Sequence, residues 1–448
     1  MNDANKCAPN FEEIAGEPIA DPGETSRPAL YRAAVALLIC SCVYFAARGP
    51  WRALGEPGGA KDLRVYYCAS RAWLLGQNPY DQNVLKEINR QAGGGDKGVD
   101  TSLNFPPCLV PLSIIGGIPS WQAARIVWTA LGVLLTVVCL WQLSVLVGLR
   151  RSSASTVMFW AIGLALAPFH TDIAEGQMSI LVTTAVILAL RCQIEKHPKM
   201  AGVMLGLAVA IKPPMALLLP VMLLFRGQWR MLVYTVFTGA ILTGLAVGKM
   251  NLFGVHWFPN FWENLQAFSH GGRGDATGPD SYKMIHLEVV LAGAIQDPKT
   301  VHMLTAAMVG VLGAAAMLAL RGLRDRRSEL LLWGLCGVLC LMSFYNRLYS
   351  ATLLVLPLAW AIGSLGRPGL RGVSCAMLLL ILPFLVPGQV ALATLAAGRP
   401  QLAAMTGWRL LLYHQVFLLP LLGIAIGCAA VKLQKTDKHP PAAEISPA

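Results

Sequence analysis

Long apolar runs are the feature that most limits how this chain can fold. Apolar residues make up 55% of its 448 residues, charged residues only 13%, and the mean hydropathy is +0.55. In ordinary soluble domains about a quarter of the residues are charged. Many of the runs approach the roughly 20 residues that a helix needs to cross a bilayer. Because backbone polar groups in lipid must be paired internally, the sequence predicts an all-α, polytopic membrane protein.

The apolar runs predict about twelve transmembrane helices. We expect them at residues 31–47, 122–148, 156–169, 179–191, 201–211, 215–225, 231–248, 301–320, 329–345, 351–362, 373–395 and 408–431. Residues 109–118 are too short to cross and follow two prolines, which indicates a re-entrant or interfacial piece.

Polar segments divide the rest of the chain. Residues 1–28 and 433–448 are expected to be disordered cytoplasmic tails on either side of a membrane domain at 29–432. Two long outer loops, 48–105 and 251–283, interrupt this domain, and loops of that length are usually functional. The second carries several aromatic residues in its first half, which predicts an interfacial helix.

Basic residues indicate the orientation. They gather in short connections at alternate ends of the predicted helices, at 150–151, 191–199, 226–230, 321–327, 367–371 and 432–438. The positive-inside rule makes these ends cytoplasmic and places both termini inside. The net charge of +12 is therefore a sign of membrane topology and does not indicate a nucleic-acid partner.

Asp62 is the first catalytic candidate. It lies in "KDLRVYYCASRAWLLGQNPYD", which reads as an amphipathic helix that ends near Gly76. Asp62 shares a helix face with Tyr66 and Trp73, which we expect to anchor the helix at the lipid surface. A partly desolvated carboxylate there would suit a general base. The alternative is a structural role, with Asp62 capping the helix N-terminus.

Two cationic residues are candidates for binding an anion. Lys212 interrupts "GLAVAIKPPMALLLP" at a double proline, where its charge needs water or an anion, unless the side chain simply reaches the interface. Arg347 in "LMSFYNRLYSATLL" can hold a phosphate bidentately, and Tyr345 and Tyr349 beside it can pack a sugar ring. The alternative for this second segment is an aromatic belt with one exposed arginine.

Further polar residues are candidates for substrate binding. The segment "PFHTDIAEGQMSILV" is expected to hold His170, Asp172, Glu175 and Gln177 in one outer turn, where Gln177 could bind sugar hydroxyls, although a hydrated hairpin is the alternative. His256 in the second long loop is a further substrate-binding candidate. No metal-ligand spacing, P-loop or dinucleotide motif is found, so no metal or cofactor is expected.

Five motifs together resemble glycosyltransferase family 87, which belongs to the C-type superfamily (GT-C) of polytopic membrane glycosyltransferases. They are "DLRVYYCASRAWLLGQNPYD", "NFPPCLVPLS", "EGQMSILVTTAVILAL", "GLAVAIKPPMALLLP" and "SFYNRLYSATLL". Their order along the chain is the specific part of the resemblance. One departure is that related sequences often have His and Asp where this chain has Asn346 and Ser350.

The resemblance implies an enzyme that transfers a sugar, typically mannose, from a polyprenyl-phosphate donor to an acceptor hydroxyl, with inversion. It implies that Asp62 is the general base, and that the partners are a lipid-linked donor, a glycan or glycolipid acceptor and membrane lipid. The expected site of action is the outer face of a bacterial inner membrane. The rival interpretation is a transporter or flippase for a lipid-linked sugar or polyol, since broken helices also suit a transport cavity.

Overall fold

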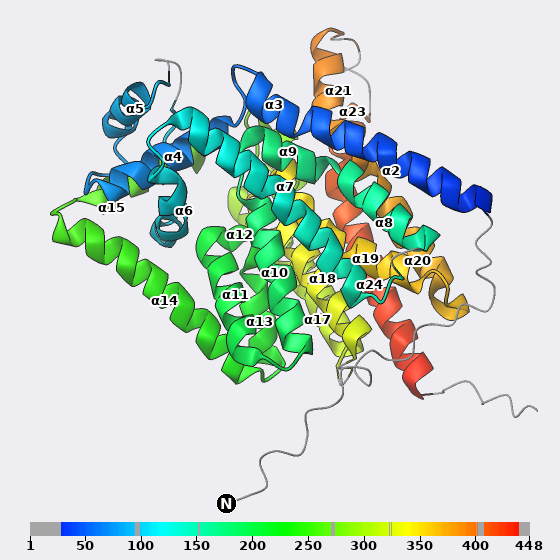
Figure 1. Ribbon diagram of the computed structural model, residues 1–448. Helices are drawn as coiled ribbons and strands as arrows, with labels where there is room; N and C mark the ends of the chain where they lie inside the picture. Colours follow the sequence, from blue (N-terminus) through cyan, green and yellow to red (C-terminus); the bar gives the residue numbers. More distant parts are fainter. Residues whose placement is uncertain are drawn as a thin grey trace, which may run out of the picture.

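The computed structural model (Figure 1) describes residues 28–94, 99–150, 153–269, 274–321, 323, 325–399, 401 and 407–438. The predicted N-terminal tail therefore lies almost wholly outside the described residues. The last helix, α24 (His414–Lys438), continues beyond residue 432, where the C-terminal tail was expected to begin, and 439–448 lie outside the described residues.

All regular structure in the described residues is helical, apart from one isolated bridge between Met284 and Arg347. The all-α prediction is therefore confirmed. Six helical segments are long and apolar enough to cross a membrane. They are α2 (Pro28–Arg48) continued by α3 (Pro50–Gly55), α7 (Trp121–Leu146), α14 (Trp229–Leu252), α17 (Pro298–Ala319), α20 (Pro368–Ile381) with η4 (Leu382–Leu385), and α24.

The predicted count of about twelve crossings is larger than six because it includes apolar helices that are shorter than a spanning helix. A bent pair, α8 (Ala154–Ala165) and α9 (Ala167–Glu175), would make a seventh span among the described residues. The other helices of the membrane domain are α10 (Ser179–Ile194), α11 (Pro198–Ile211), α12 (Pro213–Ala216), α13 (Leu218–Phe225), α18 (Arg326–Ser343), η3 (Leu348–Leu354) and α19 (Val355–Ser364). The larger count stays a prediction.

Prolines explain where predicted spans are broken. The expected single span at 373–395 is wrong, because α20 ends at Ile381 and α21 (Gly388–Ala397) begins after Pro387. The expected span at 156–169 bends by 42° between α8 and α9, and Pro168 lies in the first turn of α9. Proline lacks the amide hydrogen that a continuing helix requires, so a helix is interrupted or restarted at it.

Capping residues begin several of the long helices. Ser120 accepts a hydrogen bond from the Ala123 amide at the start of α7, and Asp297 accepts one of 3.0 Å from Thr300 at the start of α17. Asp325 caps α18 by accepting a bond of 3.0 Å from the Arg327 amide. Each cap satisfies donors that the first helical turn leaves unpaired.

The basic helix ends lie together on one side of the molecule, in the lower part of Figure 1. Arg226 at the end of α13 forms an ion pair of 2.5 Å with Glu329 at the start of α18. Gln193 near the end of α10 donates to the same carboxylate over 2.9 Å. These contacts join three of the ends that the charge pattern predicted to share one membrane face.

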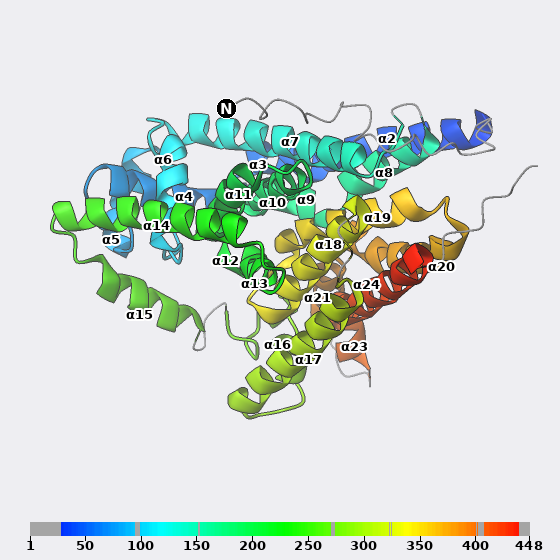
Figure 2. The ribbon, with the colours of Figure 1, turned by 90° about the horizontal axis from the view of Figure 1, so that it is seen from below.

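The two long outer loops pack against each other at the end of the molecule where α14 finishes (Figure 2). The first contains α4 (Lys61–Leu74) and α5 (Gln82–Gln91) and is followed by η1 (Pro106–Cys108) and α6 (Leu109–Gly116); the second contains α15 (Trp257–Ser269). Asn264 of α15 donates to the Tyr80 carbonyl over 2.9 Å, and Tyr80 and Phe261 have ring centroids 5.1 Å apart. A helix thus forms where the aromatic run predicted one.

Three short elements complete the described chain. They are η2 (Ser281–Lys283), α16 (Glu288–Leu291) and α23 (Trp408–Leu412). The first ends the second long loop and the second follows it, with Met284 and its bridge to Arg347 between them.

Candidate functional site

Helix α4 presents Asp62 from its first turn. Ala60 is the N-cap, in the left-handed conformation with φ of 53°, and its amide donates to the Ala174 carbonyl over 2.8 Å. No side chain makes a capping bond at this helix start. The capping interpretation of Asp62 is therefore wrong. Its carboxylate instead faces another part of the chain.

Gln177 links Asp62 to Tyr66. The side-chain Nε2 of Gln177 donates to Oδ2 of Asp62 over 2.5 Å, and the Tyr66 hydroxyl donates to Oε1 of Gln177 over 2.8 Å. Since Oε1 already accepts from a hydroxyl, the amide is held with its NH₂ group toward the carboxylate. Asp62 and Tyr66 lie one helical turn apart, so both reach the same partner.

The aromatic face of α4 does not anchor the helix in lipid, and that prediction is wrong. Tyr66 is 9% exposed and Trp73 is 7% exposed. The indole Nε1 of Trp73 donates to the Ala246 carbonyl of α14 over 3.0 Å, and the Lys249 ammonium lies 4.6 Å from the centroid of the Trp73 ring. Both residues pack inside the protein because α14 and Gln177 supply partners for their polar atoms.

The predicted polar turn at 170–177 is also different in the structure. Residues up to Glu175 form the helix α9, and the connection to α10 is only the three residues 176–178, with Gly176 at φ of 71°. His170 and Asp172 are 1% and 2% exposed, so this segment is not a hydrated hairpin. Asp172 accepts a bond of 2.8 Å from the Ser179 amide and thereby caps α10. Of this group, only Gln177 reaches the site described below.

Lys212 occupies the break between α11 and α12 that Pro213 and Pro214 impose. Its Nζ donates to Oγ of Ser179 over 2.9 Å and lies 4.5 Å from the centroid of the Tyr349 ring. The side chain is thus held by a hydroxyl and an aromatic face within the protein. It does not extend to the interface as a freely solvated lysine.

Arg347 lies in the connection between α18 and η3. Its backbone forms the isolated bridge with Met284, and the Ile285 amide donates to the neighbouring Asn346 carbonyl over 2.9 Å. The guanidinium lies 5.8 Å from the Tyr345 ring centroid. Asn346 is 1% exposed and donates to the Cys340 carbonyl over 3.0 Å, so this departure from the family pattern serves the local backbone.

One cavity of about 580 Å³ brings most of the candidates together. The predicted site residues that line it are Asp62, Gln177, Lys212, Tyr345, Arg347 and Tyr349. They come from the ends of α4, α10, α11, α18 and η3, which the alternating topology carries to one side. His256 is exposed just before α15 and does not line this cavity, so the structure does not bring it to the other predicted site residues.

Several lining residues were not predicted from the sequence. Asp100, Thr101, Asn104 and Phe105 come from the end of the first long loop, and Phe268 comes from α15. The motif "NFPPC" contains two of them and was the available signal, although nothing in its spacing indicated a cavity wall. The sequence indicates Tyr66 only as part of a helix face, yet its side chain lines the cavity and donates a hydrogen bond to Gln177.

The charges around Asp62 act in opposite directions. Burial of the carboxyl group raises the pKa of Asp62 above its ordinary value, and the nearby Glu175 carboxylate raises this pKa further. The bond from Gln177 and the charges of Lys61 and Arg347 lower the pKa by smaller amounts. Among the residues that the structure describes, no three His, Cys, Asp or Glu side chains gather as metal ligands.

Two curated proteins are similar to part of this chain. Both are polyprenol-phosphate-mannose-dependent alpha-(1-2)-phosphatidylinositol mannoside mannosyltransferases. The one from Mycobacterium tuberculosis is 27% identical over 211 residues, which cover 44% of this chain and 47% of that protein. The one from Mycolicibacterium smegmatis is 26% identical over 193 residues, which cover 39% and 41%. The matches therefore span less than half the length of these relatives. No solved structure gives a significant match.

A family model gives the broader match. The model of glycosyltransferase family 87 covers residues 104–343, which is more than half of the 448 residues. The matched region contains Gln177 and Lys212, whereas Arg347 lies just beyond its end and Asp62 lies well before its start. The family inferred from the ordered motifs is confirmed: the chain belongs to glycosyltransferase family 87.

Proposed function

We propose that this protein is a membrane hexosyltransferase that transfers a mannosyl group from a polyprenyl-phosphate donor to a hydroxyl of a glycan or glycolipid acceptor. The observation that supports this most is the composition of one cavity wall. A carboxylate with a raised pKa, Asp62, shares the cavity with the two cations Lys212 and Arg347. A base that shares a cavity with a phosphate-binding pair suits inverting sugar transfer from a phosphate ester.

In the proposed reaction Asp62 is the general base. It removes the proton of the acceptor hydroxyl as that oxygen attacks the anomeric carbon, and the bond from that carbon to the phosphate oxygen breaks on the opposite face. The products are the inverted glycoside and polyprenyl phosphate, with the proton on Asp62. Negative charge grows on the departing phosphate, so Lys212 and Arg347 would stabilise the transition state more than the ground state.

The remaining lining residues have supporting roles in this proposal. Gln177 holds the Asp62 carboxylate through its 2.5 Å bond and keeps it oriented toward the cavity. Tyr345 and Tyr349 line the same cavity and offer ring faces for a sugar. The lysine and arginine lie beside these rings, at 4.5 Å and 5.8 Å, so the phosphate and the sugar would be held next to each other.

We further propose that the cavity faces the periplasm or cell exterior of a bacterial inner membrane, with both termini in the cytoplasm. The clustering of the basic helix ends on one side supports this orientation, because cytoplasmic ends carry the excess of Lys and Arg. The acceptor class follows the names of the curated relatives, which are phosphatidylinositol mannoside mannosyltransferases.

Sugar transfer in membrane vesicles tests the proposal. Full-length protein is supplied with polyprenyl-phosphate-mannose and a glycolipid acceptor, and wild type is compared with Asp62→Asn. We expect Asp62→Asn to lower turnover by about 10²-fold to 10⁴-fold, the usual contribution of a general base. Asp81→Asn is the matched control, since Asp81 caps α5 in the same loop and does not line the cavity.

Two outcomes would contradict the proposal in different ways. Equal turnover by wild type and Asp62→Asn would remove Asp62 as the base while leaving the transferase activity. Transfer from no lipid-linked sugar, together with movement of labelled polyprenyl-phosphate-mannose across the vesicle membrane, would indicate the rival transport function.

A further inference from the structure

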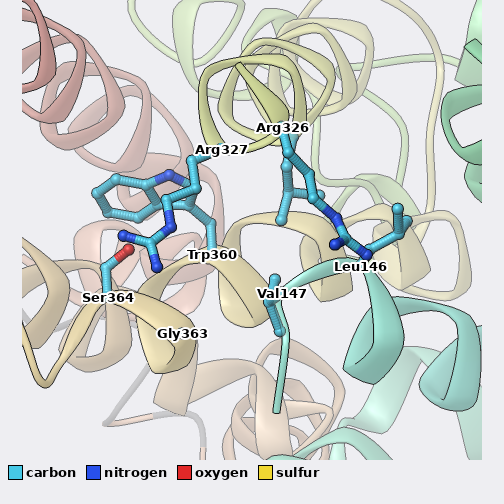
Figure 3. A pocket seen from close by; sticks show the side chains of 8 residues that line it. Leu146, Val147, Arg326, Arg327, Trp360, Gly363 and Ser364 are labelled. Atoms are coloured by element: carbon cyan, nitrogen blue, oxygen red, sulfur yellow. The ribbon is translucent and has the colours of Figure 1, made fainter. Parts of the chain in front are cut away.

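A narrow cleft lies at the opposite end of α18 from Arg347. The 18 residues of α18 make it about 27 Å long, which is close to the thickness of the bilayer core. The cleft lies among the basic helix ends, between the C-terminus of α7, the first turn of α18 and the last turn of α19 (Figure 3). Its lining includes Leu146, Val147, Arg326, Arg327, Trp360 and Ser364.

The cleft contains hydrogen-bond donors that lack acceptors. Nη1 of Arg327 and Nε1 of Trp360 are both buried without a partner in the described part of the chain. Trp360 and Ser364 are each only 1% exposed. Figure 3 shows the Arg327 guanidinium beside the Trp360 indole and directed toward the Ser364 hydroxyl. An unpaired buried donor costs about 1–3 kcal/mol, so such a cluster calls for an acceptor.

Neighbouring carboxylates are engaged elsewhere. Asp325 accepts from the backbone amides of Arg327 and Ser328 as the cap of α18, and Glu329 pairs with Arg226. Glu195 pairs with Arg191 over 2.7 Å. No ion pair to the Arg327 side chain is found among the described residues. Within the described part of the chain, no ion pair therefore neutralises the Arg327 guanidinium at the cleft.

Arg326 has a different part in the cleft. Its Nη2 donates to the Val145 carbonyl at the end of α7, and Figure 3 shows its guanidinium turned toward Leu146. This arginine is thus held in place as part of the cleft wall. The neighbouring Arg327 side chain instead lies beside Trp360 and Ser364 of α19. With Leu146 and Val147 the wall is partly apolar, as the entrance to a site for a lipid headgroup would be.

The size of the cleft defines how a ligand could enter. Its enclosed volume is about 10 Å³, which holds one water-sized atom. We propose that this cleft binds a phosphate group by taking one phosphate oxygen between Arg327 Nη1, Trp360 Nε1 and the Ser364 hydroxyl, with the rest of the group outside. The phosphate belongs to an anionic lipid headgroup or to free phosphate. The site is separate from the proposed donor cavity and independent of the sugar-transfer reaction.

Binding to the full-length protein in nanodiscs tests this site. One arm measures retention of phosphatidylglycerol in phosphatidylcholine discs by native mass spectrometry. The other measures the thermal shift that inorganic phosphate produces in discs of phosphatidylcholine alone, against chloride at the same ionic strength. Loss of a charge-assisted bond predicts that Arg327→Gln weakens binding of the responding probe about tenfold. Arg230→Gln, an exposed arginine on the same side, is the control and should bind as wild type does.

A second variant keeps the test decisive if Arg327→Gln fails to fold. Trp360→Phe retains the ring and removes only the N–H, so we expect binding weaker by roughly threefold to tenfold. A response to phosphatidylglycerol alone identifies a lipid headgroup as the source, and a response to inorganic phosphate alone identifies the free anion. The proposal is overturned if neither probe binds, or if both variants bind the probe as tightly as Arg230→Gln does, which would leave the cleft to water.

Discussion

Nε2 of Gln177 lies 2.5 Å from Oδ2 of Asp62, and the same amide accepts the Tyr66 hydroxyl through its oxygen. The group that Gln177 directs at Asp62 is thus its NH₂, a hydrogen-bond donor, which favours the ionised form of the carboxylate. A donor that favours the ionised form lowers a carboxyl pKa, while burial and a second carboxylate raise it. Here the raising effects are larger, so the pKa of Asp62 is above its ordinary value.

Opposite pH shifts are expected from two substitutions next to Asp62. As a general base, Asp62 must be ionised, so kcat/KM falls as the pH drops below its pKa. Gln177→Ala removes a donor to the ionised form and should move this acid limb to higher pH. Glu175→Gln removes a negative charge and releases Lys61 from its 2.9 Å ion pair, so the acid limb should move to lower pH. The pH dependence of kcat/KM for both variants measures this.

The signs of these shifts separate a specific effect from general damage. Tyr66→Phe is a second test of the same contact, because it leaves Gln177 in place but removes the hydroxyl that orients its amide. We expect its acid limb to move in the same direction as that of Gln177→Ala, since the amide is then free to rotate its NH₂ away from Asp62. Shifts of the same sign for the Gln177 and Glu175 variants would refute the electrostatic account.

Gly176 sets the distance between α4 and α10. Its φ is 71°, and a Cβ added to it would lie 2.5 Å from the Cβ of Leu63, in the first turn of α4. Gly176→Ala should therefore push Asp62 away from Gln177 and lower turnover by about 10²-fold, the usual effect of a displacement near 1 Å. Gly148→Ala is a matched control, since its φ is 69° and nothing lies within 4 Å of its added Cβ.

The two glycine variants share the cost of a left-handed alanine, about 1 kcal/mol. Thermal unfolding of both in detergent should show that common loss, and sugar transfer should fall strongly only in Gly176→Ala. Equal activity of the two variants would mean that the approach of α4 to α10 does not control the site.

Much of the fold could be predicted because its determinants are local. Apolar run length predicted the all-α class, and the helical spacing after Lys61 predicted the helix that α4 forms at Lys61–Leu74. The basic connections predicted which helix ends lie together, and the ordered motifs predicted the family. Apolar run length alone does not show the effect of proline, so the run at 373–395 predicts one span where Pro387 separates two helices.

The details of the site depend on tertiary partners that periodicity does not reveal. A polar residue near a helix start looks like a cap, and only the position of Gln177, 115 residues away, gives Asp62 another partner. In the sequence, Tyr66 and Trp73 have the spacing of a lipid-facing stripe. In the structure they are buried and donate hydrogen bonds to Gln177 and to the Ala246 carbonyl. His256 is a sequence-based candidate because it lies in the second long outer loop, yet a position in that loop does not fix the direction of its side chain.

Lys212 and Arg347 should differ in what a conservative substitution does. If both bind the donor phosphate, Lys212→Met should lower kcat/KM by about 10²-fold, since one charge on the leaving group is lost. Arg347→Lys keeps the charge but loses the planar fork, so a substantial loss is also expected there. Initial rates at varied donor concentration measure both.

A control with another lysine tests whether the effect of Lys212 is specific. Lys249 donates to the Leu74 carbonyl over 3.0 Å and does not line the cavity. Lys249→Met should therefore leave the donor KM unchanged, even if it lowers stability. Wild-type kinetics for Lys212→Met would show that this lysine serves only to hold Ser179.

The ion pair between Arg226 and Glu329 should control stability and leave the chemistry intact. The two side chains are 8% and 7% exposed, and they lie at the end of the helices remote from the cavity. Glu329→Gln leaves a buried guanidinium without its counter-charge, which typically costs about 3–5 kcal/mol. The exposed pair of Arg191 and Glu195 is the control, and Glu195→Gln should cost about 0–1 kcal/mol. Denaturation in detergent compares the two losses.

Adding Arg226→Met to Glu329→Gln should restore most of the lost stability, because it removes the unpaired charge. Equal losses for the buried and exposed pairs would mean that Arg226 remains solvated in the folded protein.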